Sequence, residues 1–166
     1  MRFSLIPDVT APEVFTVTPA LLQEKGITLL LLDLDNTLSP YSEALPSERV
    51  LAWMAAHKKA GISLFLVSNN RDETRVSRYG DACGVSCISR AGKPNPKGLL
   101  EAMAELGKHP GETALMGDQV FTDGLAANRA GALSIVIKPI ERQNLWFHLR
   151  YFLEQPFRLL SKERYT

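Results

Sequence analysis

The sequence is poor in the features that mark secreted, membrane-spanning and nucleic-acid-binding proteins. Its 166 residues include two cysteines, Cys83 and Cys87, too few for a disulfide framework and typical of free thiols in a reducing compartment. A net charge of +1 gives no electrostatic argument for nucleic acid. No apolar run approaches the roughly 20 residues that span a bilayer. The first 15 residues, MRFSLIPDVTAPEVF, hold prolines and acids where a signal peptide needs an apolar stretch. These absences predict a cytoplasmic protein without a nucleic-acid partner.

What the sequence does contain is a regular alternation of short apolar runs and longer amphipathic ones. Continuous apolar runs predict strands buried on both faces, as in a parallel sheet. Amphipathic stretches with prolines or caps near their starts, and glycines at most of their ends, predict helices. The expected strands are 27–34, 62–68, 84–89, 113–118 and 133–139, and the expected helices are 46–61, 71–80, 95–107 and 121–131.

This alternation predicts an α/β protein built from right-handed βαβ units. The length favours one domain, residues 1–166, with a core of about 27–139 and a C-terminal helical segment of about 140–166. Ligands in such open sheets bind at the carboxyl ends of strands. Polar residues follow four of the predicted strands: Asp33-Leu34-Asp35-Asn36-Thr37, Ser68-Asn69-Asn70, Lys93 and Lys97 within GKPNPKG, and Gly117-Asp118-Gln119 with Asp123 beyond.

Together these residue types suit phosphoryl chemistry at a magnesium ion. Carboxylates are the oxygen ligands that Mg²⁺ prefers, and a lysine and a serine hydroxyl can orient phosphoryl oxygens. One carboxylate can attack phosphorus while a second acts as general acid and base. Taken singly, each cluster has a plainer interpretation: an Asx-type turn for DLDNT, a turn or N-cap for SNN, a surface lysine for Lys93, and a first-turn acid of a helix for Asp123.

The four clusters occur together and in order, and here the chain resembles a known family. DLDNTL, VSNN, Lys93-Pro94 and GDQVFTD are similar to motifs one to four of the haloacid dehalogenase (HAD) superfamily, over about residues 27–139. The capless type IIIA phosphatases of the YqeG family are the closer match, since Ile6-Pro7-Asp8 and Asn128-Arg129-Ala130-Gly131 also fit their pattern. That group is similar to the phosphatidylglycerophosphate phosphatases of fungi and plants.

The resemblance implies a capless three-layer Rossmann-like fold whose five strands, numbered along the chain, lie in the order 5-4-1-2-3. It also implies Mg²⁺ as cofactor and a role for each matching residue. Asp33 would be the nucleophile and a metal ligand, and Asp35 the general acid/base with its backbone carbonyl on the metal. Asp118 and Asp123 would be motif-four metal acids, Asp123 directly or through water. The phosphate site would be formed by Ser68 and Lys93, lined by Asn36, Asn69 and Asn70.

The spacing between motifs bears on the substrate. One helix and one strand fill the interval from Asp35 to Ser68, and the interval to Lys93 is also nearly filled, which leaves no room for a cap domain. By resemblance, capless enzymes have open sites for bulky substrates or borrow a lid from a partner subunit. A phosphorylated lipid headgroup such as phosphatidylglycerophosphate is the favoured substrate. Two alternatives stay open: a HAD phosphatase for a sugar phosphate, nucleotide or phosphoprotein, and a non-catalytic phosphate-binding module that acts through a partner protein.

The C-terminal segment, residues 138–166, holds six Lys/Arg against three Asp/Glu and six aromatic residues. It is predicted to form an amphipathic helix. The favoured interpretation packs its Leu145, Leu149, Phe152 and Leu153 face on the sheet. The other places an apolar stripe in a membrane interface, as a peripheral contact, or against a second subunit in a homodimer.

Overall fold

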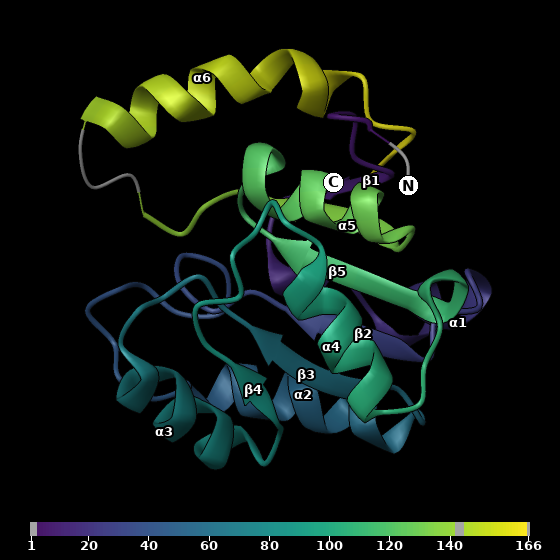
Figure 1. The fold of residues 1–166 in the computed structure, drawn as a ribbon, viewed down its shortest axis with the longest axis vertical. Helices are drawn as coiled ribbons and strands as arrows, with labels where there is room; N and C mark the ends of the chain where they lie inside the picture. The colour runs from purple at the N-terminus through teal and green to yellow at the C-terminus, as the bar shows by residue number, and fades with distance from the viewer. Residues whose placement is uncertain (1–2, 142–144, 166) are drawn as a thin grey trace.

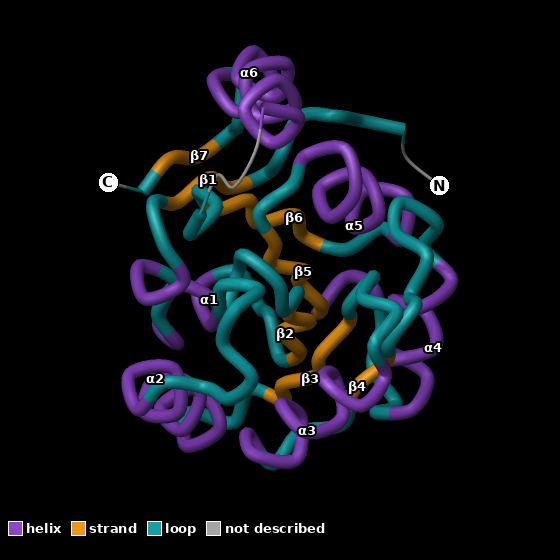
Figure 2. Tube along the Cα trace, turned by 90° about the vertical axis from the view of Figure 1, so that its left-hand side faces the viewer, coloured by secondary structure: helices purple, strands orange, loops and turns teal. Residues whose placement is uncertain are grey.

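The computed structural model describes residues 3–141 and 145–165. Its centre is a seven-stranded parallel sheet in the order β4-β3-β2-β5-β6-β1-β7, with helices on both faces (Figures 1 and 2). The strands are β1 (Val9–Ala11), β2 (Leu29–Leu32), β3 (Ser63–Val67), β4 (Cys87–Ile88), β5 (Thr113–Gly117), β6 (Leu133–Ile137) and β7 (Glu163–Arg164). The helices are α1 (Pro19–Glu24), α2 (Glu48–Lys59), α3 (Glu73–Cys83), α4 (Lys97–Glu105), α5 (Leu125–Ala130) and α6 (Leu145–Leu159), with short turns η1 (Val14–Thr16), η2 (Pro110–Glu112) and η3 (Val120–Gly124).

Strand β2 explains why the most apolar run of the sequence is continuous. Side chains alternate between the two faces of a strand. Leu30 and Leu32 join the core under α1, α2 and α3, whereas Leu29 and Leu31 join the core under α4 and α5. All four leucines are completely buried. The predicted buried central strand is therefore confirmed, and Asp33 and Asp35 follow it in the chain.

The predicted order 5-4-1-2-3 is confirmed, since it corresponds to β6-β5-β2-β3-β4. Two short strands beyond β6, β1 and then β7 at the sheet edge, and helix α1 extend the core beyond the prediction. β1 and β7 have three and two residues, too few to show a period in the sequence. The four predicted helices between strands are present with shifted ends. The predicted helix over 121–131 is divided into the π-helical turn η3 and the short helix α5.

The prediction for the C-terminal segment is correct in element and wrong in orientation. Residues 145–159 form α6, but the face expected to pack on the sheet is exposed: Leu145 by 84%, Leu149 by 48%, Phe152 by 72% and Leu153 by 52%. The buried side chains of α6 are Glu154 and Arg158. Arg158 donates to the carbonyls of Ile137 and Asp118, and Glu154 accepts from the Phe121 amide. The helix therefore packs through hydrogen bonds to backbone groups, and not through the apolar contact that the sequence predicted.

Helix α6 lies at one end of the molecule, beyond β6 and α5 (Figures 1 and 2). Arg142, one of the six basic residues of the C-terminal segment, lies outside the described residues. Within 3–141 and 145–165, no helix has both the length and the apolar character needed to cross a bilayer.

Candidate active site

The carboxyl ends of the central strands open into a pocket of about 330 Å³. β2 pairs in parallel with β3 on one side and β5 on the other, so residues that follow these strands meet at one edge of the sheet. The pocket is lined by Asp33, Asp35, Tyr41, Ser68, Asn69, Asn70, Lys93, Gln119, Thr122 and Asp123. Residues from all four predicted motifs therefore lie at this edge.

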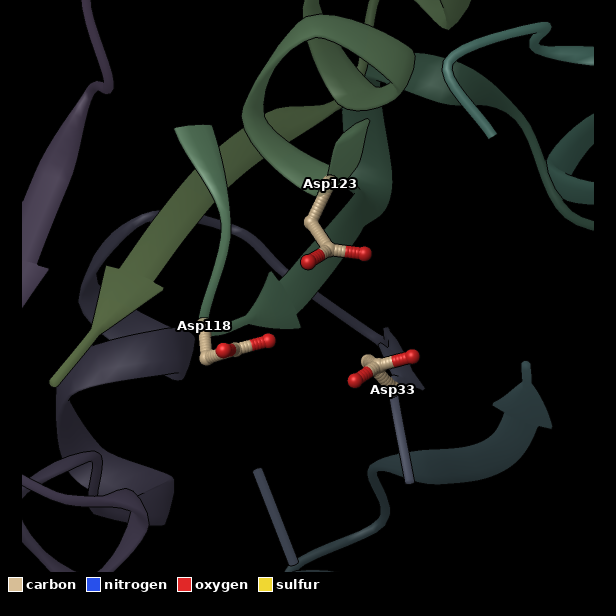
Figure 3. Close-up of side chains that lie close together, drawn as sticks. All are labelled: Asp33, Asp118 and Asp123. Atoms are coloured by element: carbon tan, nitrogen blue, oxygen red, sulfur yellow. The ribbon is translucent and has the colours of Figure 1, made fainter. Parts of the chain in front are cut away.

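Three acids form a buried cluster beside the pocket. Asp33, Asp118 and Asp123 each place a carboxylate oxygen within 4.8 Å of the other two, and their side chains converge (Figure 3). Asp123 approaches closely because residue 117 is a glycine: a Cβ atom there would lie 2.3 Å from the Asp123 Cγ. The Asp123 carboxylate accepts hydrogen bonds from the Gln119 amide at 3.1 Å and the Thr122 hydroxyl at 3.4 Å, which fix its orientation.

Lys93 is the cation of this cluster. Its Nζ lies 2.7 Å from Asp33 Oδ1, 2.7 Å from Asp123 Oδ1 and 2.7 Å from the Val67 carbonyl. Asn69 holds the Lys93 backbone in both directions, donating to its carbonyl and accepting from its amide, each at 2.8 Å. Three carboxylates around one ammonium leave negative charge in excess when all are ionised, even with Arg150 3.7 Å from Asp118. A divalent cation is attracted by that excess.

Burial makes these charges costly, and the pKa values respond to it. Burial raises the pKa of Asp33 to about 6; the Lys93 ammonium opposes this rise and Asp123 adds to it. Burial, together with the charges of Asp123 and Asp33, also raises the pKa of Asp118 well above its ordinary value. For Lys93, burial opposes the charged form, but Asp123 and Asp33 outweigh it and raise the pKa. The cluster therefore stores electrostatic repulsion that a bound metal would relieve.

Asp118 gives a direct sign of such a metal site. Both of its buried carboxylate oxygens accept no hydrogen bond within the described part of the chain. Among the described residues its ion-pair partner is Arg150 of α6, at 3.7 Å. Buried polar atoms are nearly always satisfied, so a buried carboxylate without a hydrogen-bond donor beside two others suits a cation ligand. Asp33, Asp118 and Asp123 are the residues that fit a divalent metal ion.

Asp35 lies in the same pocket but outside this acidic cluster. Its carboxylate accepts from Asn70 Nδ2 at 2.6 Å and from Arg75 at 2.9 and 3.1 Å. Arg75, from the first turn of α3, was missed in the sequence because nothing in the spacing connects it with Asp35, 40 residues earlier. It also donates to the carbonyls of Pro40 and Glu43, so it holds the Asp35 loop in place. That the Asp35 carbonyl binds the metal stays a prediction.

The structure brings most of the predicted phosphate-site residues together. Ser68, Asn69, Asn70 and Lys93 line the pocket. Of the two lysines, Lys93 lies in the pocket wall, whereas Lys97 is an exposed side chain 3.7 Å from Glu101. Asn36 is not brought to the pocket: it is buried with φ 64°, donates to the Glu141 carbonyl at 2.8 Å and accepts from the Glu141 amide at 2.9 Å. It anchors the chain that leaves β6.

Several residues of the site were not among the predicted catalytic, phosphate-binding or metal-binding residues. Thr37 donates to Asp33 Oδ2 at 3.0 Å, and Gln119 and Thr122 extend the pocket wall. Tyr41 lines the pocket and packs edge-on against Phe147 of α6, with ring centroids 6.4 Å apart. Thr37 and Gln119 are close in sequence to motif acids, so their place in the site could have been predicted from the sequence. Tyr41 could not, because its place depends on a contact between distant segments.

Comparison with known proteins agrees with this geometry. The sequence profile of the haloacid dehalogenase-like hydrolases matches residues 13–131. The chain is 31% identical over 156 residues, 94% of its length and 90% of the relative, to a probable phosphatase, YqeG, of Bacillus subtilis (strain 168). It is 27% identical to a phosphatidylglycerophosphate phosphatase of Arabidopsis thaliana, over 97% of this chain and 49% of that one. This chain thus spans about half of the plant protein.

Solved structures share the fold. A 3-deoxy-D-manno-octulosonate 8-phosphate phosphatase from Moraxella catarrhalis superposes with a TM-score of 0.60 at 22% identity, over 87% of this chain and 80% of that one. NagD from E. coli K-12 gives 0.58 at 14% identity, over 84% and 96%. At these identities the likeness concerns the fold alone. The profile match over most of the chain and the YqeG relative show that this chain belongs to the haloacid dehalogenase-like hydrolases and is a phosphatase of that family.

Proposed function

We propose that the chain is a Mg²⁺-dependent phosphomonoester hydrolase that works through an aspartyl-phosphate intermediate and acts on a phosphorylated lipid headgroup such as phosphatidylglycerophosphate. The observation that carries this proposal is the buried cluster of Asp33, Asp118 and Asp123 around the Lys93 ammonium, with Asp33 open to the pocket. A carboxylate held beside a metal site and an ammonium suits attack on a phosphoryl group.

Asp33, Asp118 and Asp123 would hold the metal. Mg²⁺ takes oxygen ligands in octahedral geometry and keeps waters and substrate phosphate in its remaining positions. When bound, it would neutralise phosphoryl charge and the excess negative charge of the cluster. The Moraxella catarrhalis relative was crystallised with magnesium and phosphate ions, which supports the choice of Mg²⁺.

The chain's own residues suit the two half-reactions. In the first, an Asp33 oxygen bonds to phosphorus, the ester P–O bond breaks, and Asp35 gives its proton to the departing oxygen. In the second, Asp35 takes a proton from water, water oxygen attacks the aspartyl phosphate, and phosphate leaves with Asp33 restored. Lys93 and Thr37 hold the Asp33 carboxylate by its two oxygens, while Asn70 and Arg75 hold Asp35 in the pocket.

The phosphoryl oxygens have donors in the pocket wall. Ser68 Oγ accepts from the Asn70 amide at 3.0 Å, so its own proton is available for a phosphoryl oxygen. Lys93 supplies charge, and Asn69 positions it through the backbone. These donors would stabilise charge as it develops in the transition state.

The lipid substrate rests on two observations. A relative over nearly all of this chain is named a phosphatidylglycerophosphate phosphatase. The described segments from Asp35 to Ser68 and from Ser68 to Lys93 contain α2, β3, α3 and β4, with no inserted domain that would cover the pocket. An uncovered pocket suits a headgroup presented at a surface. A soluble phosphate ester is the second candidate, since the pocket chemistry is the same.

The test is phosphate release with Mg²⁺ from micellar phosphatidylglycerophosphate and from p-nitrophenyl phosphate. Asp33→Asn removes the nucleophile, and Lys97→Met is the matched control because that lysine is exposed. A large lipid preference that Asp33→Asn abolishes supports the whole proposal. Asp33-dependent activity on the soluble ester alone keeps the mechanism and contradicts the lipid substrate. Absence of Asp33-dependent release from both contradicts the proposal and favours the binding-module alternative.

A further inference from the structure

The outer face of α6 is an apolar surface without a partner in the described chain. It consists of Leu145, Trp146, Leu149, Phe152, Leu153 and Leu159, which recur at helical spacing and are 48% to 84% exposed. Figures 1 and 2 show α6 at the edge of the molecule, beyond β6 and α5. Folded monomers rarely expose a contiguous apolar surface of this kind unless it meets another apolar phase or molecule.

The inner face of α6 fixes this orientation. Arg158 donates to the Ile137 carbonyl at 2.8 Å and to the Asp118 carbonyl, and also pairs with Glu154 at 3.1 Å. Glu154 accepts from the Phe121 amide at 3.4 Å. Rolling the helix to bury its leucines would leave these buried charges and backbone groups unpaired, which is strongly unfavourable. The apolar face is therefore held outward by the same contacts that hold the active-site loop.

A cationic cavity lies directly beside this face. It has a volume of about 410 Å³, between α6 and the β1–β7 edge of the sheet, and it shares Leu159 with the outer face. Lys138, Arg158 and Arg164 line it, and none of its lining residues is acidic. Arg158 is 8% exposed, and its buried Nε has no hydrogen-bond partner among the described residues. An anion beside an apolar surface is the matching ligand.

We propose that α6 docks the enzyme on an anionic phospholipid surface, with its outer face in the acyl boundary and a lipid phosphodiester in the Lys138–Arg158–Arg164 cavity. An apolar helix face flanked by cations has this preference. A second copy fits less well, because a two-fold contact through α6 would bring the two cationic cavities toward each other.

Docking in this way would bring the active-site pocket near the lipid surface, because Phe147 of α6 contacts Tyr41 and Tyr41 lines that pocket. A headgroup at that surface would then have a short path to the pocket. This account of substrate access rests on the proposed function, whereas the docking itself does not require catalysis.

The test is co-sedimentation of the full chain with vesicles of phosphatidylcholine alone and of equal parts phosphatidylcholine and phosphatidylglycerol. We expect binding to the anionic vesicles that weakens with added salt.

Phe152→Glu with Leu153→Glu puts two charges on the outer face and is expected to lower partitioning more than about tenfold. The matched control is Leu51→Glu with Leu100→Glu, two exposed leucines of α2 and α4, which retains binding. Lys138→Glu with Arg164→Glu is expected to abolish the preference for anionic vesicles.

Tryptophan emission gives an independent readout. The chain has two tryptophans. Trp53 is buried and donates to the Val17 carbonyl at 2.9 Å, whereas Trp146 is 68% exposed on the outer face. Anionic vesicles are therefore expected to shift the emission to shorter wavelength, and Trp146→Phe to remove the shift.

Three results would overturn docking: no partitioning onto anionic vesicles, partitioning that Phe152→Glu with Leu153→Glu leaves unchanged, or a dimer that this variant dissociates while vesicles remain unbound. Activity on p-nitrophenyl phosphate, measured in parallel, separates the two proposals. Loss of docking with Asp33-dependent activity intact contradicts only this inference, and docking without such activity contradicts only the proposed function.

Discussion

The Lys93 ammonium lies 2.7 Å from Asp33 Oδ1, and the Lys93 side chain is 1% exposed. It connects the motif that follows β2 with the segment after β4 and also contacts Asp123. A buried charge with partners on three sides is costly to remove, because its partners stay buried. This relationship makes the site's electrostatics measurable through stability as well as activity.

Replacing Lys93 is expected to destabilise the metal-free protein. Lys93→Met leaves buried carboxylates uncompensated, and losing one partner of a buried pair costs about 3–5 kcal/mol. Urea unfolding in chelator measures this loss, and excess Mg²⁺ is expected to restore part of it. Lys97→Met is the control, because that exposed lysine has only a long contact with Glu101. Equal stability of the two variants in chelator would show that Lys93 does not balance the acids.

Asp118→Asn is expected to raise the stability of the metal-free protein, in contrast to Lys93→Met. Its carboxylate is buried without a hydrogen-bond donor in the described structure, and burial raises its pKa. Removing the charge should stabilise the metal-free protein while abolishing stabilisation by Mg²⁺. For a ligand at a hundred times its Kd that stabilisation is about 2.7 kcal/mol. Unfolding with and without Mg²⁺ measures both effects, and retained Mg²⁺ stabilisation in the variant would exclude Asp118 as a ligand.

How far the sequence predicted this arrangement depends on the range of the interactions. The LLLL run predicted a central buried strand, and parallel pairing then placed Asp33 and Asp118 on adjacent strands. Arg75 and the buried face of α6 were missed because they depend on contacts across 40 residues. The amphipathic pattern of α6 identifies a polar face and an apolar face, but it does not say which of them is buried. The polar face is buried because Arg158 supplies hydrogen-bond donors to the carbonyls of Ile137 and Asp118.

Gly117 is expected to tolerate no side chain. An added Cβ would lie 2.3 Å from Asp123 Cγ, so Gly117→Ala must displace the acid or the strand end. Overpacking of this kind costs about 1–3 kcal/mol, and displacement of Asp123 should also weaken Mg²⁺ binding. Gly111→Ala is the control, since nothing lies within 4 Å of the added atom. Unfolding in chelator and a Mg²⁺ titration measure the two effects, and a Gly117→Ala variant that matches Gly111→Ala in both would contradict the observed packing.

Arg75 is expected to act as a positioning residue for Asp35. Its guanidinium donates to Asp35 and to the loop carbonyls of Pro40 and Glu43. Because Asp35 is the proposed acid for the departing oxygen, Arg75→Met should lower kcat more for an alkyl phosphate than for p-nitrophenyl phosphate. We expect the kcat for the alkyl phosphate to fall by roughly tenfold more than that for p-nitrophenyl phosphate. General acid–base catalysis supplies about 10²–10⁴-fold, and Arg75→Met would displace Asp35 without removing it. Steady-state kinetics with both esters measures the difference. Arg78→Met, in the same helix, is the control, and an equal loss with both esters would indicate a merely structural role.

His57 is expected to make stability depend on pH. It is fully buried in α2, with Nδ1 2.8 Å from the Trp53 carbonyl, and burial lowers its pKa from 6.5. The unfolded chain therefore takes up a proton as pH falls through about 6.5, while the folded chain does not until a lower pH. Stability from this group is full above pH 6.5 and decreases below it, by at most about 1.4 kcal/mol per pH unit. His57→Gln should flatten this decrease, as measured by urea unfolding at stepped pH from neutral to mildly acidic. His148→Gln, which leaves His57 in place, should retain it, and an unchanged slope in His57→Gln would mean that another group causes the loss.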